Sequence, residues 1–92
     1  MIVKRKRLGT VQVTFVQQPR GEALFVAGSF NGWEREPLKK AKDGSVRATV
    51  KAEPGDTLVF RYVTDSGEWF DDEAPDELVV NEHGTTNGLV HV

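Results

Sequence analysis

Residues 58–70 read Leu58-Val59-Phe60-Arg61-Tyr62-Val63-Thr64-Asp65-Ser66-Gly67-Glu68-Trp69-Phe70. The alternation puts Leu58, Phe60 and Tyr62 on one face of a strand and the residues between them on the other. The segment Asp65-Ser66-Gly67 is typical of a hairpin turn, because glycine readily adopts the positive φ that such turns need. The stretch therefore predicts a two-faced strand, a tight turn, and a short returning strand at residues 68–70.

Similar short strands are expected along the rest of the chain. Residues 10–15 form one of them, because Val11, Val13 and Phe15 alternate with polar residues. The apolar run at 23–27 is typical of a central strand covered on both faces, and residues 29–43 contain turn signals and no period. Further strands are expected at 46–51, 78–80 and 88–92. Because no window favours a long helix, the sequence predicts an all-β fold, an immunoglobulin-like β-sandwich.

Size and composition exclude several classes of protein. With 92 residues, the chain has the length of one domain over residues 1–92, in which residues 1–8 form either an extra edge strand or a tail. The absence of cysteine favours a reducing cytoplasm as the location. A net charge of −2 argues against nucleic acid as a partner for the chain as a whole. No apolar run approaches the ~18 residues of a membrane span, and the basic N-terminus lacks the apolar stretch of a signal peptide.

Two tryptophans stand beside turn residues. Trp33 follows Asn31-Gly32, and Trp69 follows the turn at 65–67. An indole left open at such a place offers a flat partner for the C–H face of a sugar ring. The alternative is that both rings belong to the core, since tryptophan is highly buried on average.

A set of motifs in fixed order resembles one known family. The pieces are Val26-Ala27-Gly28-Ser29-Phe30-Asn31-Gly32-Trp33, Pro37-Leu38, Asp43-Gly44, Pro54-Gly55, Phe60-Arg61-Tyr62-Val63-Thr64-Asp65, Gly67-Glu68-Trp69 and Asn81-Glu82-His83-Gly84-Thr85-Thr86-Asn87. Together they resemble a carbohydrate-binding module of family 48, the isoamylase N-terminal-like, early-set type. The likeness includes the glycogen-binding domain of the AMP-activated protein kinase β subunit and the N-terminal modules of glycogen branching and debranching enzymes. It runs from about Gly9 to Val92 and implies an immunoglobulin-like fold.

The resemblance implies a carbohydrate-binding site. Trp33 and Trp69 would stack on glucose rings, and Arg61 would donate hydrogen bonds to hydroxyls. The family's threonine and asparagine of the last loop correspond to Thr85 and Asn87, whose side chains suit pairs of sugar hydroxyls.

Each of these residues also has a structural interpretation. Trp33 only packs the module together in many enzyme-attached members, Arg61 could pair with a carboxylate, and Thr85 and Asn87 could cap a turn.

Two positions depart from the family pattern. His83 stands where the family usually has a bulky apolar residue that presses on the ligand, and a histidine there could still stack on the sugar or hydrogen-bond to it. Ser66 is an extra turn residue, and it is expected to displace Trp69 somewhat.

Other chemistry is weakly supported. The acidic residues of segment 71–77 are expected to form a solvated loop, because glycoside hydrolysis needs two paired carboxylates with one raised pKa. Calcium is a second interpretation of these oxygens, but their spacing matches no known loop. Two histidines without cysteine do not predict a zinc site. The basic run Lys4-Arg5-Lys6-Arg7 could contact nucleic acid or an acidic partner. It is also typical of an edge strand protected from unwanted pairing.

The sequence thus predicts a non-catalytic module that binds an α-1,4-glucan such as glycogen, starch or maltodextrin. No metal, cofactor, nucleic acid or membrane is expected; a glycogen-metabolising enzyme is a candidate partner. One alternative is a protein–protein interaction module of the same fold that has lost or weakened sugar binding. Another is a module associated with an enzyme of glycoside hydrolase family 13.

Overall fold

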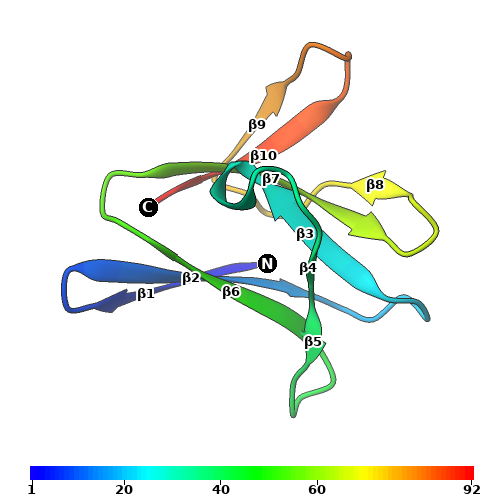
Figure 1. Cartoon of the computed structure of the whole chain (residues 1–92), viewed down its shortest axis with the longest axis horizontal. Coiled ribbons are helices and arrows are strands. Elements are labelled where there is room, and N and C mark those ends of the chain that lie inside the picture. Colours follow the sequence, from blue (N-terminus) through cyan, green and yellow to red (C-terminus); the bar gives the residue numbers. More distant parts are fainter.

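The computed structural model describes all 92 residues. The chain forms ten strands and one 3-10 helix, as Figure 1 shows: β1 (Ile2–Arg7), β2 (Thr10–Gln17), β3 (Leu24–Gly28), η1 (Ser29–Asn31), β4 (Glu36–Pro37), β5 (Lys39–Lys40), β6 (Val46–Ala52), β7 (Thr57–Thr64), β8 (Trp69–Phe70), β9 (Glu77–Val80) and β10 (Thr86–His91). No helix is long or apolar enough to cross a membrane.

The strands form two antiparallel sheets packed face to face. Sheet A has the order β1-β2-β6-β5, and sheet B has the order β4-β3-β7-β10-β9, with β8 paired to β7. In Figure 1 sheet A lies at the bottom and sheet B at the top. The predicted all-β, immunoglobulin-like sandwich is therefore confirmed.

Strand β7 is the centre of sheet B, because β3, β8 and β10 all pair with it. Its side chains alternate as the sequence predicts. Leu58, Phe60 and Tyr62 are buried between the sheets, so Arg61 lies on the outer face of sheet B. This alternation places a charged side chain on the outside, directly above the most apolar part of the core.

Aromatic rings fill that core. Phe15 of β2 lies 4.8 Å from Phe60 and 6.4 Å from Tyr62, measured between ring centroids. Phe30 of η1 stacks on Phe15 at 5.4 Å. The short helix that precedes Trp33 is therefore tied to both sheets, since its phenylalanine packs against the centre of the core.

The connection at residues 29–43 has more structure than the sequence predicts. It contains η1 and the two-residue strands β4 and β5, which pair with β3 and β6 respectively. Leu38, between β4 and β5, is buried, and its N–H donates to the carbonyl of Leu24 at 2.9 Å. A strand of two residues is too short to show any alternation, so its sequence carries no period.

The prediction of a solvated acidic loop at 71–77 is confirmed for Glu73, Asp76 and Glu77, which are exposed, but it is wrong for Asp72. Asp72 is only 4% exposed; its Oδ2 accepts from the Tyr62 hydroxyl at 2.6 Å and its Oδ1 from the Ala74 N–H at 2.8 Å. The amino group of Met1 also donates to Asp72, at 2.7 Å. Lys4 of the edge strand β1 reaches Asp76 at 2.5 Å. Acidic residues in this loop therefore join sheet B to sheet A.

These contacts set the ionisation of Asp72. Burial alone would raise the pKa of Asp72, but the hydrogen bonds from Met1, Tyr62 and Ala74 outweigh it and hold the pKa below its usual value. Burial and the neighbouring carboxylate raise the pKa of Tyr62. A carboxyl with a lowered pKa stabilises the fold above its unfolded pKa, and this contribution disappears as the pH falls through the folded pKa.

Tyr62→Phe should therefore lower the free energy of unfolding by about 1–3 kcal/mol at neutral pH, because Asp72 loses one buried donor. The difference from the original chain should shrink at acid pH, once the pH falls through the lowered pKa of Asp72, because the protonated carboxyl no longer needs that donor. Urea unfolding at the two pH values measures both quantities. An equal loss at neutral and acid pH would show that the hydroxyl acts by packing alone.

Candidate functional site

A cavity of about 460 Å³ opens among elements of sheet B. Its size lies in the range of small-molecule sites. The lining comes from the turn after η1, from β7 and β8, and from the segment joining β9 to β10: Trp33, Arg61, Trp69, Asn81, Glu82, His83, Thr85 and Asn87. The structure thus brings together all six residues that the sequence singled out and adds Asn81 and Glu82. That the six bind sugar stays a prediction.

Trp33 is held by the turn that follows β3. Gly32 and Trp33 both have left-handed backbone angles, with φ of 67° and 65°. The N–H of Trp33 donates to the carbonyl of Gly28 at 2.9 Å, and the Asn31 side chain bridges the Gly28 N–H and the Glu34 carbonyl. A left-handed non-glycine residue costs about 1 kcal/mol or more and persists mainly at functional sites. In this turn Trp33 is 42% exposed.

Trp69 is positioned by the hairpin between β7 and β8. It pairs with Val63, and Gly67 supplies the positive φ of the turn, 94°. The Thr64 hydroxyl accepts from the Glu68 N–H at 3.0 Å and contacts the Ser66 hydroxyl at 3.0 Å. The extra residue Ser66 is thus absorbed within the turn, and Trp69 still lines the same cavity as Trp33. The residue is 40% exposed.

The core interpretation of the two tryptophans is wrong. Both rings are exposed and both border one cavity. The sandwich core contains phenylalanines, one tyrosine and aliphatic residues instead.

Arg61 both lines the cavity and pairs with a carboxylate, which are the two alternatives that the sequence left open. It lines the cavity, and its Nε donates to Asp71 Oδ1 at 3.0 Å. Asp71 also accepts a short hydrogen bond from the Thr86 hydroxyl. The ion pair with Asp71 fixes the direction of the Arg61 side chain. The guanidinium Nη1 and Nη2 make no hydrogen bond within the chain, so their N–H groups remain available to a ligand.

Asn81 organises the segment between β9 and β10. Its Oδ1 accepts from the N–H groups of His83 and Thr85, at 2.9 and 3.2 Å. Its Nδ2 donates to Thr85 Oγ1 at 2.7 Å and to Asn87 Oδ1 at 3.3 Å. Because both acceptors are occupied by Asn81, the Thr85 hydroxyl proton and the Asn87 amide protons remain free for a ligand. Thr85 and Asn87 are therefore both turn residues and cavity residues.

Sequence reasoning missed Asn81 and Glu82 as lining residues. A signal for Asn81 was present, because an asparagine a few residues before a turn glycine commonly bonds to the main chain ahead of it. Nothing in the spacing marks Glu82. The Glu82 and His83 side chains are largely exposed at the rim, with 3.7 Å between His83 Nε2 and Glu82 Oε1.

The polar groups of the cavity are mostly donors. Arg61, Thr85 and Asn87 contribute N–H and O–H groups, and Glu82 is the single carboxylate of the lining. No group of three or more histidine, aspartate or glutamate side chains is placed to hold a metal ion. Two flat apolar rings beside a few directed donors can take a ligand that has both an apolar face and a rim of hydroxyls.

Comparison with known proteins identifies the family. Residues 11–92 match the family model described as the glycogen recognition site of AMP-activated protein kinase. A comparison with curated proteins found none that matches. The match extends from the second strand to the last residue and includes every residue of the cavity. The chain therefore belongs to this family of glycogen recognition domains, the family 48 carbohydrate-binding modules.

Proposed function

We propose that the chain binds linear α-1,4-glucan segments of glycogen, starch or maltodextrin in the cavity of sheet B, without cleaving them. The single observation that carries this proposal is the pair of half-exposed indoles, Trp33 and Trp69, on one cavity. Each ring offers an apolar plane to a glucose ring, and the curved glucan brings successive rings against both.

The polar residues supply orientation. Arg61 donates from the floor formed by β7, while Thr85 and Asn87 donate from the segment between β9 and β10. Few ligand atoms are buried in such a shallow site, so we expect affinities of roughly micromolar to millimolar. Hydrolysis would need two carboxylates flanking the scissile bond, and Glu82 alone lines the cavity.

The rival function is recognition of a protein, for example a glycogen-metabolising enzyme, by the same surface. One observation favours it: the rim carries the polar pair Glu82 and His83, where the family usually presents an apolar residue after the glutamate position. The cavity can be tested for sugar directly, which separates the two functions.

Titration with maltoheptaose, followed by amide-resolved NMR, tests the proposal. We expect saturable shifts of the Trp33 and Trp69 indole N–H signals and of the amides of residues 81–87, with smaller shifts in sheet A. Cellohexaose, whose β-linkages make a straight chain, is the matched control and should shift them little. Absence of shifts at millimolar maltoheptaose would overturn the proposal, and equal shifts with both sugars would overturn its α-1,4 selectivity.

A further inference from the structure

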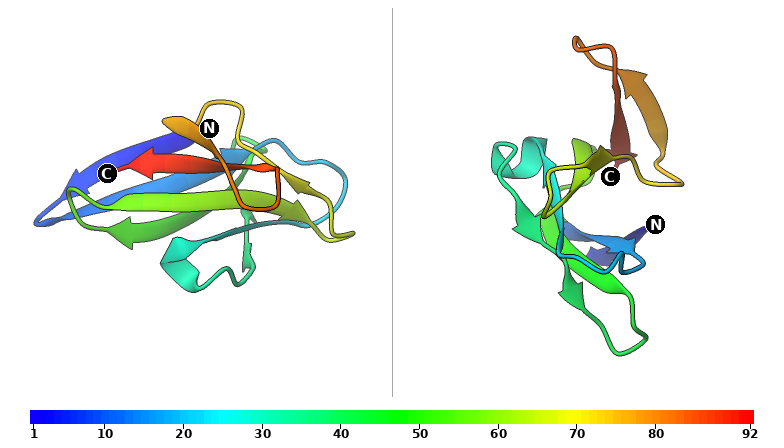
Figure 2. Two further views of the ribbon diagram at one scale, coloured as in Figure 1. Left: turned by 90° about the horizontal axis from the view of Figure 1, so that it is seen from above. Right: turned by 90° about the vertical axis from the view of Figure 1, so that its right-hand side faces the viewer.

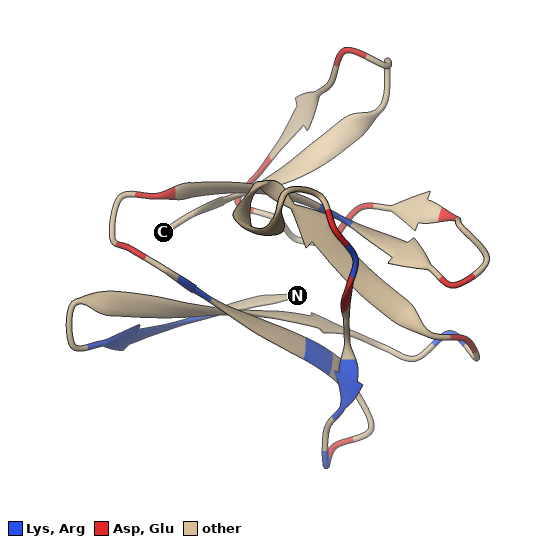
Figure 3. Cartoon of the chain, viewed as in Figure 1, with Lys and Arg blue, Asp and Glu red and all other residues tan.

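Charge is divided between the two sheets. Residues 1–17 and 39–52, which form sheet A and its turns, hold nine of the twelve lysines and arginines and one of the fourteen carboxylates. This part of the chain therefore has a formal charge of +8, and the remainder has −10. Figure 3 shows the division, with Lys and Arg on the strands below and most Asp and Glu on the loops of sheet B. The net charge of −2 hides it.

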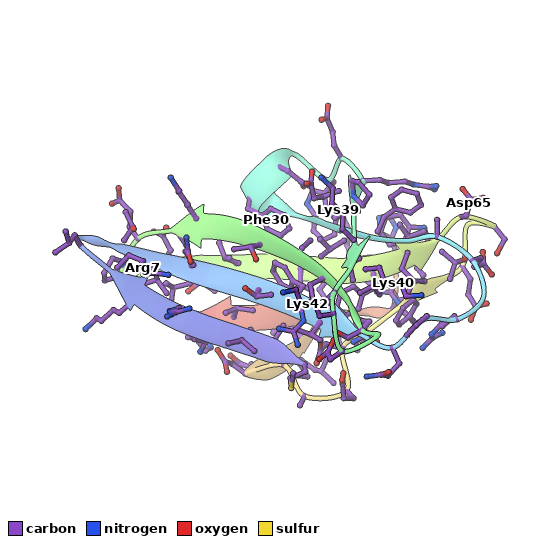
Figure 4. All side chains as sticks on the ribbon, turned by 90° about the horizontal axis from the view of Figure 1, so that it is seen from below. Arg7, Phe30, Lys39, Lys40, Lys42 and Asp65 are labelled. Atoms are coloured by element: carbon purple, nitrogen blue, oxygen red, sulfur yellow. The ribbon has the colours of Figure 1, made fainter.

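Several of these cations share the outer face of sheet A. Arg5 pairs with Gln12, and Gln12 pairs with Lys51, so the three side chains form a row across β1, β2 and β6. Alternation places Arg7 on the same face of β1. Arg47 and Lys39 form a second basic row on β6 and β5. Figure 4 looks onto this sheet and shows Arg7 near one end and Lys39, Lys40 and Lys42 toward the other.

Protection of an edge strand does not explain this arrangement. It accounts for the basic residues of β1, which is at the edge of sheet A. Arg47 and Lys51 belong to β6, which is paired on both sides. One carboxylate, Asp43, neutralises part of this face, through its contact with Arg47 at 2.9 Å.

The side chains that lie among the cations limit which kinds of partner this face can bind. Gln12, Thr14 and Thr49 lie between them, and the two threonine hydroxyls bond to each other at 2.9 Å. No aromatic side chain is available there to stack on the bases of a single-stranded nucleic acid. The face also lacks the apolar centre that a protein interface usually buries. A spread of cations over a flat polar surface fits a partner that is itself a broad anionic surface.

The turn between β1 and β2 adds an apolar group. Leu8 is fully exposed at its tip, directly after Arg7, and Val3 is exposed on β1 on the same face as Arg5 and Arg7. Basic residues combined with exposed apolar side chains are the composition of interfacial membrane-binding segments.

We propose that the outer face of sheet A docks on membranes that contain anionic phospholipids. Lys and Arg contact the headgroups, and Leu8 enters the interface at the edge of the contact. The glucan cavity lies among elements of sheet B, on the opposite side of the sandwich. A docked molecule therefore turns the cavity away from the membrane, so the two ligands do not compete.

Vesicle flotation tests this docking. The original chain should bind vesicles of phosphatidylcholine with phosphatidylserine and not vesicles of phosphatidylcholine alone, and added salt should release it. Arg5→Gln with Arg7→Gln should weaken binding roughly 25-fold, at about fivefold for each cation. The control pair, Arg20→Gln with Arg35→Gln, makes the same change in charge outside sheet A and should leave binding unchanged. Leu8→Ser should weaken binding without a change in salt dependence.

Three results would overturn the proposal. They are equal binding to both kinds of vesicle, equal losses in the two double variants, and tighter binding to duplex DNA or to a second copy of the chain in low salt. The melting temperatures of all variants are measured alongside, because a loss confined to a folded Arg5/Arg7 variant supports docking. Titration with maltoheptaose in the presence of vesicles should give the same affinity as without them.

Discussion

Replacing Trp69 by alanine should abolish retention of the chain on a glycogen or amylose affinity gel. Trp69 is 40% exposed and forms one wall of the cavity, so its removal takes away one of the two stacking planes. Loss of such an aromatic anchor typically costs about 2 kcal/mol or more, roughly thirtyfold in affinity. Because the expected affinity is only micromolar to millimolar, a further loss of roughly thirtyfold should take the chain below what the gel retains.

The effect should come from the ring and not from a loss of structure. The melting temperature of Trp69→Ala should change little, because β8 is only two residues long and its side chain at this position points out of the core. Trp69→Tyr keeps a flat ring and should restore part of the retention. Unchanged migration of Trp69→Ala, with β-cyclodextrin still competing, would place the sugar elsewhere on the molecule.

Gly28→Ala should produce the largest loss of stability of any single methyl added to the chain. A Cβ at this position would lie 2.2 Å from the carbonyl oxygen of Val59 and 2.7 Å from a ring carbon of Phe30. Val59 belongs to the central strand β7, so its main chain cannot move without disturbing the pairing on both sides. We expect a loss of about 3 kcal/mol or more in the free energy of unfolding, or roughly 12–24 °C in melting temperature.

A matched substitution separates this contact from the general cost of replacing glycine. Gly44 has a positive φ of 87°, and no atom lies within 4 Å of the place that an added Cβ would take. Gly44→Ala should therefore cost only the backbone strain, about 1 kcal/mol. Thermal unfolding of the two variants measures the difference. Similar melting temperatures for both variants would mean that the main chain of β7 shifts at Val59 to make room for the methyl group, which would contradict this prediction.

Much of the fold could be predicted from local sequence patterns, in which strand alternation or a turn glycine allows only one arrangement of the side chains. The alternation through Leu58, Phe60 and Tyr62 fixes which face of β7 is buried, and it thereby places Arg61 outside. The turn glycine Gly67 likewise marks where the chain reverses. In each case a local pattern and the burial of apolar area point to the same structure.

Other features depend on partners that are distant in the sequence. Asp72 can be buried because Tyr62 and Met1 donate hydrogen bonds to it. The sequence of the acidic loop does not show which distant residues will be its neighbours. The strands β4 and β5 flank the buried Leu38 and pair with β3 and β6, which lie earlier and later in the sequence.

The candidate site shows the same division between local and distant signals. The two tryptophans beside turns suggested a sugar, and the family resemblance implied Arg61, Thr85 and Asn87, but the shared cavity depends on how three hairpins meet. The positive charge of sheet A is another feature that the sequence alone did not reveal. The net charge of −2 adds a basic sheet to an acidic one, and the two nearly cancel.

The segment between β9 and β10 is held together from within. Every hydrogen bond of the Asn81 side chain ends inside residues 81–87, and Figure 2 shows this turn reaching beyond the rest of the fold. The conformation of residues 81–87 therefore depends little on the rest of the fold. We therefore expect that substitutions at Glu82 and His83 change the selectivity of the proposed saccharide site while the sandwich beneath keeps its shape.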